Sequence, residues 1–179
     1  MADGTFEIFL KLTGIQGEST DAKHKNEIVV LSYEQSVSHP APSGGAGGAG
    51  AGRAIFSGVR FRKPIDKGSV SLLLACASGK HIIEGLFTFR RIGPPAVEFY
   101  KVKLSDVMVT GMVQTAGTGT QYPLSFTTLD AGTDSAGFLD EVTLDYSKIQ
   151  WEYQPVGPDG KPLGSPATGG WDLKANKKI

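Results

Sequence analysis

The stretch His39–Gly58, HPAPSGGAGGAGAGRAIFSG, separates two runs of strand-forming sequence, and its centre has no side chain able to fill a core. Ser43–Gly52 consists of six glycines, three alanines and one serine. Fixing one residue's backbone costs roughly 1–2 kcal/mol, so holding the whole stretch rigid would cost on the order of 20–40 kcal/mol. Because no local burial offsets that cost, we expect His39–Gly58 to be a mobile extended loop that waits for a partner.

The composition predicts one globular domain over all 179 residues. Its 18 basic and 18 acidic residues cancel, which argues against nucleic acid or an anionic membrane as the main partner. No signal-peptide pattern and no run of about 18 apolar residues is present. The single cysteine, Cys76, is expected to be a buried, inert thiol, which fits a reducing cytoplasm and does not exclude signal-independent export.

Two strands are expected before the loop. In Phe6–Leu12 the apolar residues alternate, which predicts a half-buried strand. In the second predicted strand, Glu27–Val37, the run Ile28, Val29, Val30 and Leu31 is apolar on both faces. Such a run is either buried on both sides or lies at a contact between subunits.

One helix is predicted, over Lys67–Ser78. Asp66 is a suitable N-cap, and Gly79 stands where a left-handed C-cap belongs. The helical spacing of Val70, Leu73, Leu74 and Ala77 forms an apolar stripe that we expect to pack on a sheet or at the mouth of a barrel. Burying its three larger side chains should contribute on the order of 5–8 kcal/mol.

A strand is predicted before the helix, from Ala54 to Arg62. After the helix only strands are predicted. Tight turns are expected at Thr115–Thr120 and at Ser147–Lys148, and the chain ends in a basic tail, residues 174–179. The fold class is therefore mainly β, a single antiparallel β-barrel with one flanking helix and the long Gly-rich loop. The later predicted strands are His81–Arg90, Ala96–Leu104, Asp106–Val113, Tyr122–Leu129, Phe138–Tyr146, Ile149–Tyr153 and an edge strand at Trp171–Leu173.

Motifs for ligand binding are weak in this sequence. Gly45–Gly50 matches G-x-G-x-x-G, but no helix follows it to hold a phosphate. Asp130–Glu141 has acidic residues at three positions of an EF-hand loop, but it lacks the central glycine and is more simply a polar turn. His24, His39 and His81 are far apart in sequence, and His24 is expected to be solvated. We predict no catalytic residue, metal site or cofactor.

Charged residues on the strands are expected to face solvent, with a ring interface as the alternative. Asp140 and Glu141 should point to opposite faces of their strand and so cannot act as a carboxylate pair. The basic residues of this predicted surface are Arg60, Arg62, Lys63, Arg90, Arg91, Lys101 and Lys103.

Four stretches, in order and over nearly the whole chain, resemble the haemolysin-coregulated protein (Hcp) family. The first is Phe9–Leu12 with Gly14–Ser19 and Glu27–Leu31, and the second is the helix Asp66–Gly79. The third is Glu141–Tyr153, EVTLDYSKIQWEY, and the fourth is Gly170–Lys178, GWDLKANKK.

The resemblance implies a tube component of the bacterial type VI secretion system, present in the cytoplasm and then exported without a signal peptide. Its hexameric rings would stack into a tube that is capped by a spike, surrounded by a sheath and able to carry effectors. By position His39–Gly58 would be the loop that reaches the next ring, and Ile28–Leu31 is our expected subunit contact. The expected stacking residues are His39, Ser43, Gly44, Gly48, Gly52 and Arg53.

Two other classes remain open from the residues alone. One is a monomeric β-barrel that binds a small ligand inside, and the other is an enzyme with an unrecognised site. The molecular mass in solution separates the first from a ring protein, and hydrolase screening addresses the second.

Overall fold

The computed structural model describes residues 6–40, 53–116 and 138–179. The predicted strand Tyr122–Leu129, most of the turn Thr115–Thr120 and most of Asp130–Glu141 lie outside the described residues, as do residues 41–52 of the predicted loop. The elements are β1 (Phe6–Leu12), β2 (Ile28–Val30), β3 (Ser32–Glu34), β4 (Val37–Ser38), β5 (Ile55–Phe56), β6 (Val59–Pro64), α1 (Lys67–Ser78), β7 (His81–Arg91), β8 (Val97–Ala116), β9 (Phe138–Tyr153), β10 (Ala167–Asp172) and β11 (Lys177–Lys178).

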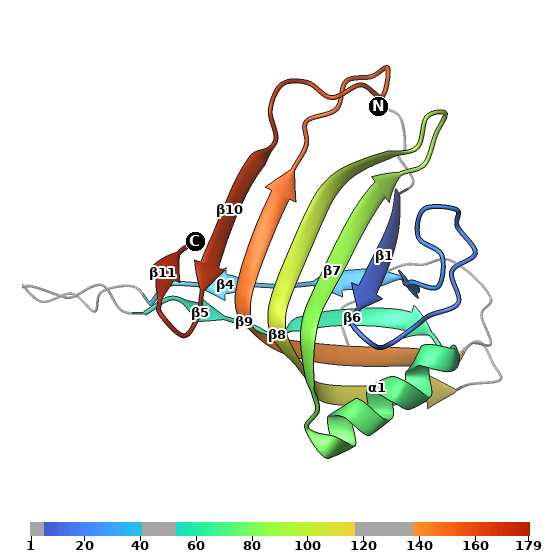
Figure 1. Cartoon of the computed structure of the whole chain (residues 1–179), viewed down its shortest axis with the longest axis vertical. Helices are drawn as coiled ribbons and strands as arrows, with labels where there is room; N and C mark the ends of the chain where they lie inside the picture. The colour runs from blue at the N-terminus through green and yellow to red at the C-terminus, as the bar shows by residue number, and fades with distance from the viewer. Residues whose placement is uncertain (1–5, 41–52, 117–137) are drawn as a thin grey trace, which may run out of the picture.

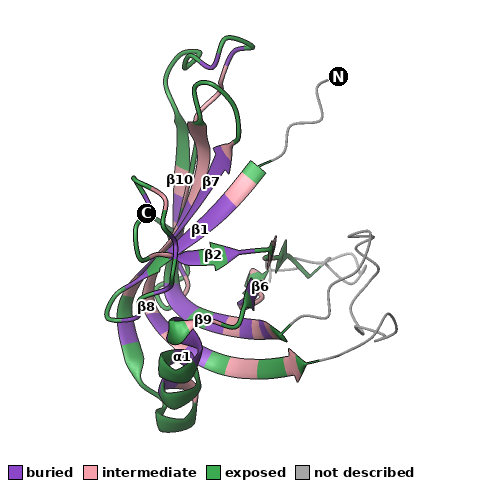
Figure 2. Cartoon of the chain, turned by 90° about the vertical axis from the view of Figure 1, so that its right-hand side faces the viewer, coloured by how far each residue is buried: buried purple, intermediate pink, exposed green. Residues whose placement is uncertain are grey.

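Nine strands form one antiparallel sheet, and β4 and β5 form a separate two-stranded ribbon. The main path runs β11-β10-β9-β8-β7-β1-β2, and β6 joins it by pairing with β9 on one side and β3 on the other. Figure 1 shows β7 to β10 standing side by side, with the far ends of β8 and β9 turning beneath them. The bent sheet encloses a core that includes Leu10, Ile28, Phe61, Phe87, Val102, Leu104, Leu144 and Ile149 (Figure 2).

The mainly β class with one helix is confirmed, but the strand pairing does not support a single closed barrel. The hydrogen-bonded path has β2 at one end and β11 at the other. The last strand pair between β7 and β8 joins His81 to Met108, so in the described sheet Val109–Ala116 pairs with β9 alone. The long β8 therefore extends beyond the end of β7, and its last residues have a hydrogen-bonded neighbour on one side only. The alternation of apolar residues shows which face of a strand is buried, but it does not show where the pairing between two strands ends.

Two predicted strand breaks are wrong, because β8 and β9 are continuous strands of 20 and 16 residues. At the first break Asp106 adopts a left-handed backbone, with φ of 53°, and the strand continues. At the second, Ser147 and Lys148 form no turn, since Ser147 donates a hydrogen bond from Oγ to Asp106 Oδ2 at 2.5 Å across the strand pair. Polar residues that suggested turns are thus cross-strand partners.

The predicted helix and both of its caps are confirmed. The Asp66 side chain accepts a hydrogen bond from the Gly68 N–H at 2.9 Å, and the Asp66 N–H donates to Ser69 Oγ at 3.0 Å. Gly79 closes the helix with a left-handed φ of 62°, a backbone that favours glycine.

The predicted orientation of the helix is wrong. Val70 is 63% exposed and Leu74 is 64% exposed, so the apolar stripe faces away from the core. The buried face carries Gly68, Ser69, Leu72 and Ala75 instead.

The last part of the predicted loop His39–Gly58 is not an unpaired segment as expected, because it contains β5. Within the described residues Ile55 and Phe56 pair with Ser38 and Val37, which gives the base of the loop a short ribbon. The Phe56 ring stacks with Trp151 and Trp171 at centroid distances of 6.4 and 6.3 Å. The C-terminal tail is also paired, since β11 binds to β10.

Candidate functional site

A buried ion cluster fixes the start of α1 to the sheet. Lys63 on β6 and Asp140 on β9 are both 0% exposed, and Lys63 Nζ donates to Asp140 Oδ2 at 2.9 Å. The same ammonium donates to Ser69 Oγ at 2.9 Å and to the Pro64 carbonyl at 2.7 Å, and Asp66 Oδ1 lies 2.8 Å away. All three donors of the ammonium group are therefore used.

The Asp140 carboxylate is equally well satisfied. Ser69 Oγ donates to Asp140 Oδ2, and Gln114 Nε2 on β8 donates to Oδ1 at 2.8 Å. Burial raises the pKa of Asp140, but the hydrogen bonds from Ser69, Gln114 and Lys63 outweigh it and hold the pKa below its usual value. The cluster is thus a charged joint between β6, β8, β9 and α1.

A second charged cluster holds the segment between β1 and β2 on the sheet. Arg90 Nη2 on β7 binds Glu7 Oε2 and Asp21 Oδ2, each at 2.6 Å. Arg90 Cζ also lies 4.9 Å from the centroid of the Phe9 ring. The hydrogen bond from Arg90 holds the pKa of Asp21 well below its usual range, so this carboxylate stays charged.

His24 belongs to this second cluster, and its predicted exposure is wrong. The residue is 5% exposed and its ring stacks on Phe9, with centroids 4.2 Å apart. His24 Nδ1 lies 2.9 Å from Glu27 Oε2, and Nε2 lies 3.5 Å from Glu98 Oε1. The Phe9 side chain, on the polar face of β1, is covered in this way and becomes buried.

The predicted solvent-facing row of basic residues is wrong at several positions. Lys63 and Arg90 are buried in the two clusters, and Arg62 binds Glu141 at 3.2 Å while its neighbour Lys63 binds Asp140. The two ion pairs lie on opposite faces of β6 and β9, so the prediction that Asp140 and Glu141 diverge is confirmed.

The face of the sheet turned away from the core is polar. Cross-strand partners Lys101 and Glu152, and Lys103 and Gln150, lie on it side by side. Lys103 binds Glu84 at 2.8 Å and Lys101 binds Glu98 at 3.0 Å. A hollow of about 420 Å³ lies over these residues, bordered on the far side by Thr168 and Lys178.

One cluster brings together the residue types of a hydrolase. Asp106 lies 2.9 Å from His81 Nδ1, 2.5 Å from Ser147 Oγ and 2.6 Å from Lys174 Nζ. The hydrogen bond from Lys174, followed by those from Ser147 and His81, holds the pKa of Asp106 well below its usual range. Ser147 donates to the carboxylate and not to the histidine, and a carboxylate whose pKa is held so low is a weak base for activating the hydroxyl.

The next features concern metal ligands, the single cysteine and membrane-spanning helices in the part of the chain that the structure describes. No group of three or more His, Cys, Asp or Glu residues there could hold a metal ion. Cys76 is half-buried on α1 and not fully buried as expected. No helix among the described residues is long and apolar enough to span a bilayer.

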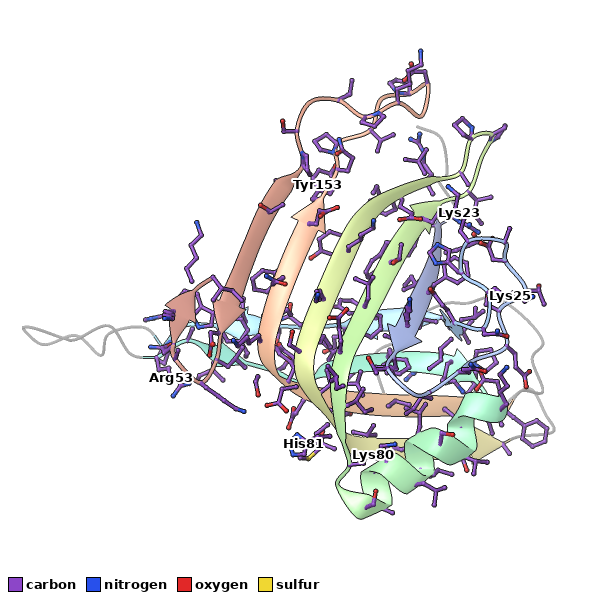
Figure 3. The ribbon with its side chains drawn as sticks, viewed as in Figure 1. Lys23, Lys25, Arg53, Lys80, His81 and Tyr153 are labelled. Atoms are coloured by element: carbon purple, nitrogen blue, oxygen red, sulfur yellow. The ribbon has the colours of Figure 1, made fainter. Side chains whose placement is uncertain are left out.

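The predicted contact run, Ile28–Leu31, is divided between core and surface. Ile28 and Val30 are buried, whereas Val29 is 39% exposed and Leu31 is 55% exposed. Of the predicted stacking residues, His39 and Arg53 are exposed and lie on either side of residues 41–52, which the structure does not describe (Figure 3 labels Arg53). Ser43, Gly44, Gly48 and Gly52 lie outside the described residues.

The sequence did contain a signal for the buried ion cluster. Lys63 shares the alternating face of Val59 and Phe61, and Asp140 shares that of Val142 and Leu144. Strict period-two alternation therefore places both charges inside the sheet. No comparable signal connects His24 to Glu98, because they belong to separate elements.

The fold and its surfaces define the class of protein: a strand-rich protein whose charged clusters hold its elements together and whose apolar surface residues are not covered within one copy. Comparison with known proteins agrees with this class. Residues 9–153 match the family described as "Type VI secretion system effector, Hcp". Protein hcp1 of Pseudomonas aeruginosa is 33% identical over 171 residues, which is 95% of this chain and 96% of that protein.

Solved structures agree as well. Hcp1 from Salmonella typhimurium is 29% identical, covers 97% of this chain and 99% of its own, and superposes with a TM-score of 0.72. A structure described as a type six secretion system protein is 27% identical, with coverage of 98% and 100% and a TM-score of 0.83. The chain belongs to the Hcp family of the type VI secretion system.

Proposed function

We propose that this chain is the tube subunit of a type VI secretion system, that six copies form a ring, and that rings stack into an exported tube. The observation that carries the proposal is the family match over residues 9–153. The tube is assembled in the bacterial cytoplasm and leaves the cell without a signal peptide. The subunit performs no catalysis.

Uncovered apolar side chains support self-assembly. Val29 and Leu31 project outward from the β2 segment, and Ile83 on β7 is 76% exposed. Val29 and Leu31 are two positions apart in one segment, and neighbouring uncovered apolar residues of this kind suit an interaction site better than isolated ones do. Ile28, Val29, Val30 and Leu31 form one subunit contact in this proposal, with the first and third anchoring the strand in the core.

The loop His39–Gly58 joins one ring to the next. His39, Ser43, Gly44, Gly48, Gly52 and Arg53 are its proposed contact residues. The polar face that carries Lys101, Lys103 and Gln150 is suited to line a wet lumen, where effectors are carried. Spike and sheath proteins of the secretion system are the other partners, and neither nucleic acid nor membrane insertion is involved.

Mass and microscopy test the proposal. Sedimentation of the purified protein should give six copies, and electron micrographs should show rings. Val29→Asp should abolish the rings, whereas Thr20→Asp, at an exposed loop position, should leave them unchanged. A single copy at high concentration contradicts the proposal and favours the monomeric barrel that binds a small ligand.

Stacking is tested separately by deletion of residues 43–52. Rings should persist because the deleted tract has no side chain that packs, while ring-on-ring stacking should weaken. Tubes of unchanged length in electron micrographs would refute the role of the loop.

A further inference from the structure

Helix α1 presents a surface that is unusual for a solvent-facing helix. Its outer face carries Val70, 63% exposed, Leu73, 38% exposed, and Leu74, 64% exposed. No charged residue occurs from Gly68 to Gly79. A helix exposed to water normally has charged or polar residues on its outer face. The α1 stripe, defined as Val70, Leu73 and Leu74, therefore has the character of a contact surface.

Two lysines border the α1 stripe. Lys67 precedes the uncharged segment and Lys80 follows it, and both are exposed (Figure 3 labels Lys80). Twelve residues lie between them in sequence. Lys67 is the first residue of the 12-residue helix and Lys80 follows its C-cap, so roughly 18 Å of helix lies between them.

A complementary surface exists on the same chain. The outward residues Val29 and Leu31 are bordered by Glu27 on one side and Glu34 on the other. Glu27 and Glu34 are seven positions apart, which corresponds to roughly 23 Å of extended chain. The β2 strip, defined as Glu27–Glu34, thus has exposed apolar residues between two carboxylates, as the α1 stripe lies between two lysines, and the spacing of the end charges is of the same order in both.

Two of these four border charges have no side-chain partner among the described residues of a single copy. Within the described residues, neither the Lys80 ammonium nor the Glu34 carboxylate has a side-chain hydrogen bond or an ion pair. Lys67 and Glu27 have local partners, because Lys67 Nζ lies 3.5 Å from Asn26 Oδ1 and Glu27 binds His24. Lys80 and Glu34 are therefore the pair that a partner copy can satisfy.

We propose that the α1 stripe of one copy docks on the β2 strip of the next copy, with Lys80 bound to Glu34 across the contact. The inference rests on the proposed ring, whose subunits it joins. A head-to-tail contact uses two different surfaces on each subunit, and repeating it closes a ring when the rotation permits. Both surfaces are present on this chain and differ in sign of charge, as such a contact requires.

The apolar part is tested with Leu74→Asp. Placing a carboxylate in a buried apolar contact should raise the concentration needed for half-assembly by about tenfold or more. Because Leu74 is exposed in a single copy, the variant should keep the wild-type thermal midpoint when measured as a monomer. Thr20→Asp is the control and should assemble like the wild type. Wild-type assembly by Leu74→Asp would overturn the inference and leave the proposed ring standing.

The charge pair is tested by exchange. Lys80→Glu and Glu34→Lys should each weaken assembly, and the double variant should recover most of it. Arg60 lies opposite Glu34 on β6, so circular dichroism must show that Glu34→Lys is folded. Failure of the double variant to assemble better than either single variant would overturn the pairing. A wild-type protein that sediments as one copy would instead refute the proposed function itself.

Discussion

Replacing Lys63 by Met is the sharpest test of the interior. Methionine has nearly the length of lysine but carries no donor. It removes three hydrogen bonds of 2.7 to 2.9 Å and leaves the fully buried Asp140 without its counter-charge. Gln114 and Ser69 remain as donors to that carboxylate.

Breaking a buried ion pair by removing one partner typically costs about 3–5 kcal/mol, and we expect a loss in this range. Both side chains are 0% exposed, so bulk solvent does not screen the pair and no discount for exposure applies. For a chain of this size each kcal/mol lowers the thermal midpoint by roughly 2–4 °C. The expected fall is therefore roughly 6–20 °C from the same relation.

The assay is urea unfolding followed by circular dichroism at one fixed protein concentration, because assembly also stabilises the folded state. Lys11→Met, on the exposed face of β1, is the matched control and should change the free energy of unfolding by less than about 0.5 kcal/mol. A further variant, Lys63→Met with Asp140→Leu, should recover much of the loss because no buried charge remains. If Lys63→Met unfolds within about 1 kcal/mol of the wild type, the reasoning about buried charge is refuted.

Three further predictions follow from the same contacts. Because hydrogen bonds lower the pKa of Asp140, its contribution to stability is full above the unfolded value of about 3.9 and is lost as pH falls through the folded pKa. Asp140→Asn should therefore be less stable than the wild type at pH 7 and should lose less stability as the pH is lowered. Thermal melting at a series of pH values measures both effects, and a variant whose stability falls with pH as that of the wild type does would contradict the prediction. Arg90→Met should release Asp21 and speed amide hydrogen exchange in residues 13–27, with unchanged exchange as the opposing result. Gly17→Ala should destabilise the fold by about 1–3 kcal/mol, because the new Cβ would lie 2.4 Å from the Glu27 carbonyl oxygen. The control is Gly169→Ala, whose Cβ would meet no atom within 4 Å and which should be nearly neutral in the same urea assay.

Prediction from sequence succeeded where a structural feature is determined by residues close together in the chain. The helix, its Asp66 and Gly79 caps and the half-buried strand β1 each follow from residues a few positions apart. Prediction from sequence failed where a feature is determined by contacts between residues far apart in the chain. Ser147 suggested a turn, but the sheet places its hydroxyl 2.5 Å from Asp106. His24 suggested a solvated loop, but Phe9 and Glu98 lie against it in the fold.

The family resemblance came from four ordered stretches of sequence, and the match over residues 9–153 confirms it. The candidate contact run Ile28–Leu31 also came from sequence, because alternation alone shows that both of its faces are apolar. Which of the two faces lies in the core is not decided by alternation. The sheet decides it, since β2 pairs with β1 in the register that buries Ile28 against Leu10.

By itself the amino-acid sequence determined that Lys67–Ser78 is a helix, since capping and periodicity act within a few residues of one another. Only the tertiary structure decided which side of that helix is buried. Lys63 and Asp140, 77 residues apart, require the Ser69 hydroxyl between them, and meeting that requirement turns Leu72 and Ala75 inward. The more apolar stripe is then left on the surface, because an unsatisfied buried charge costs more than an exposed leucine.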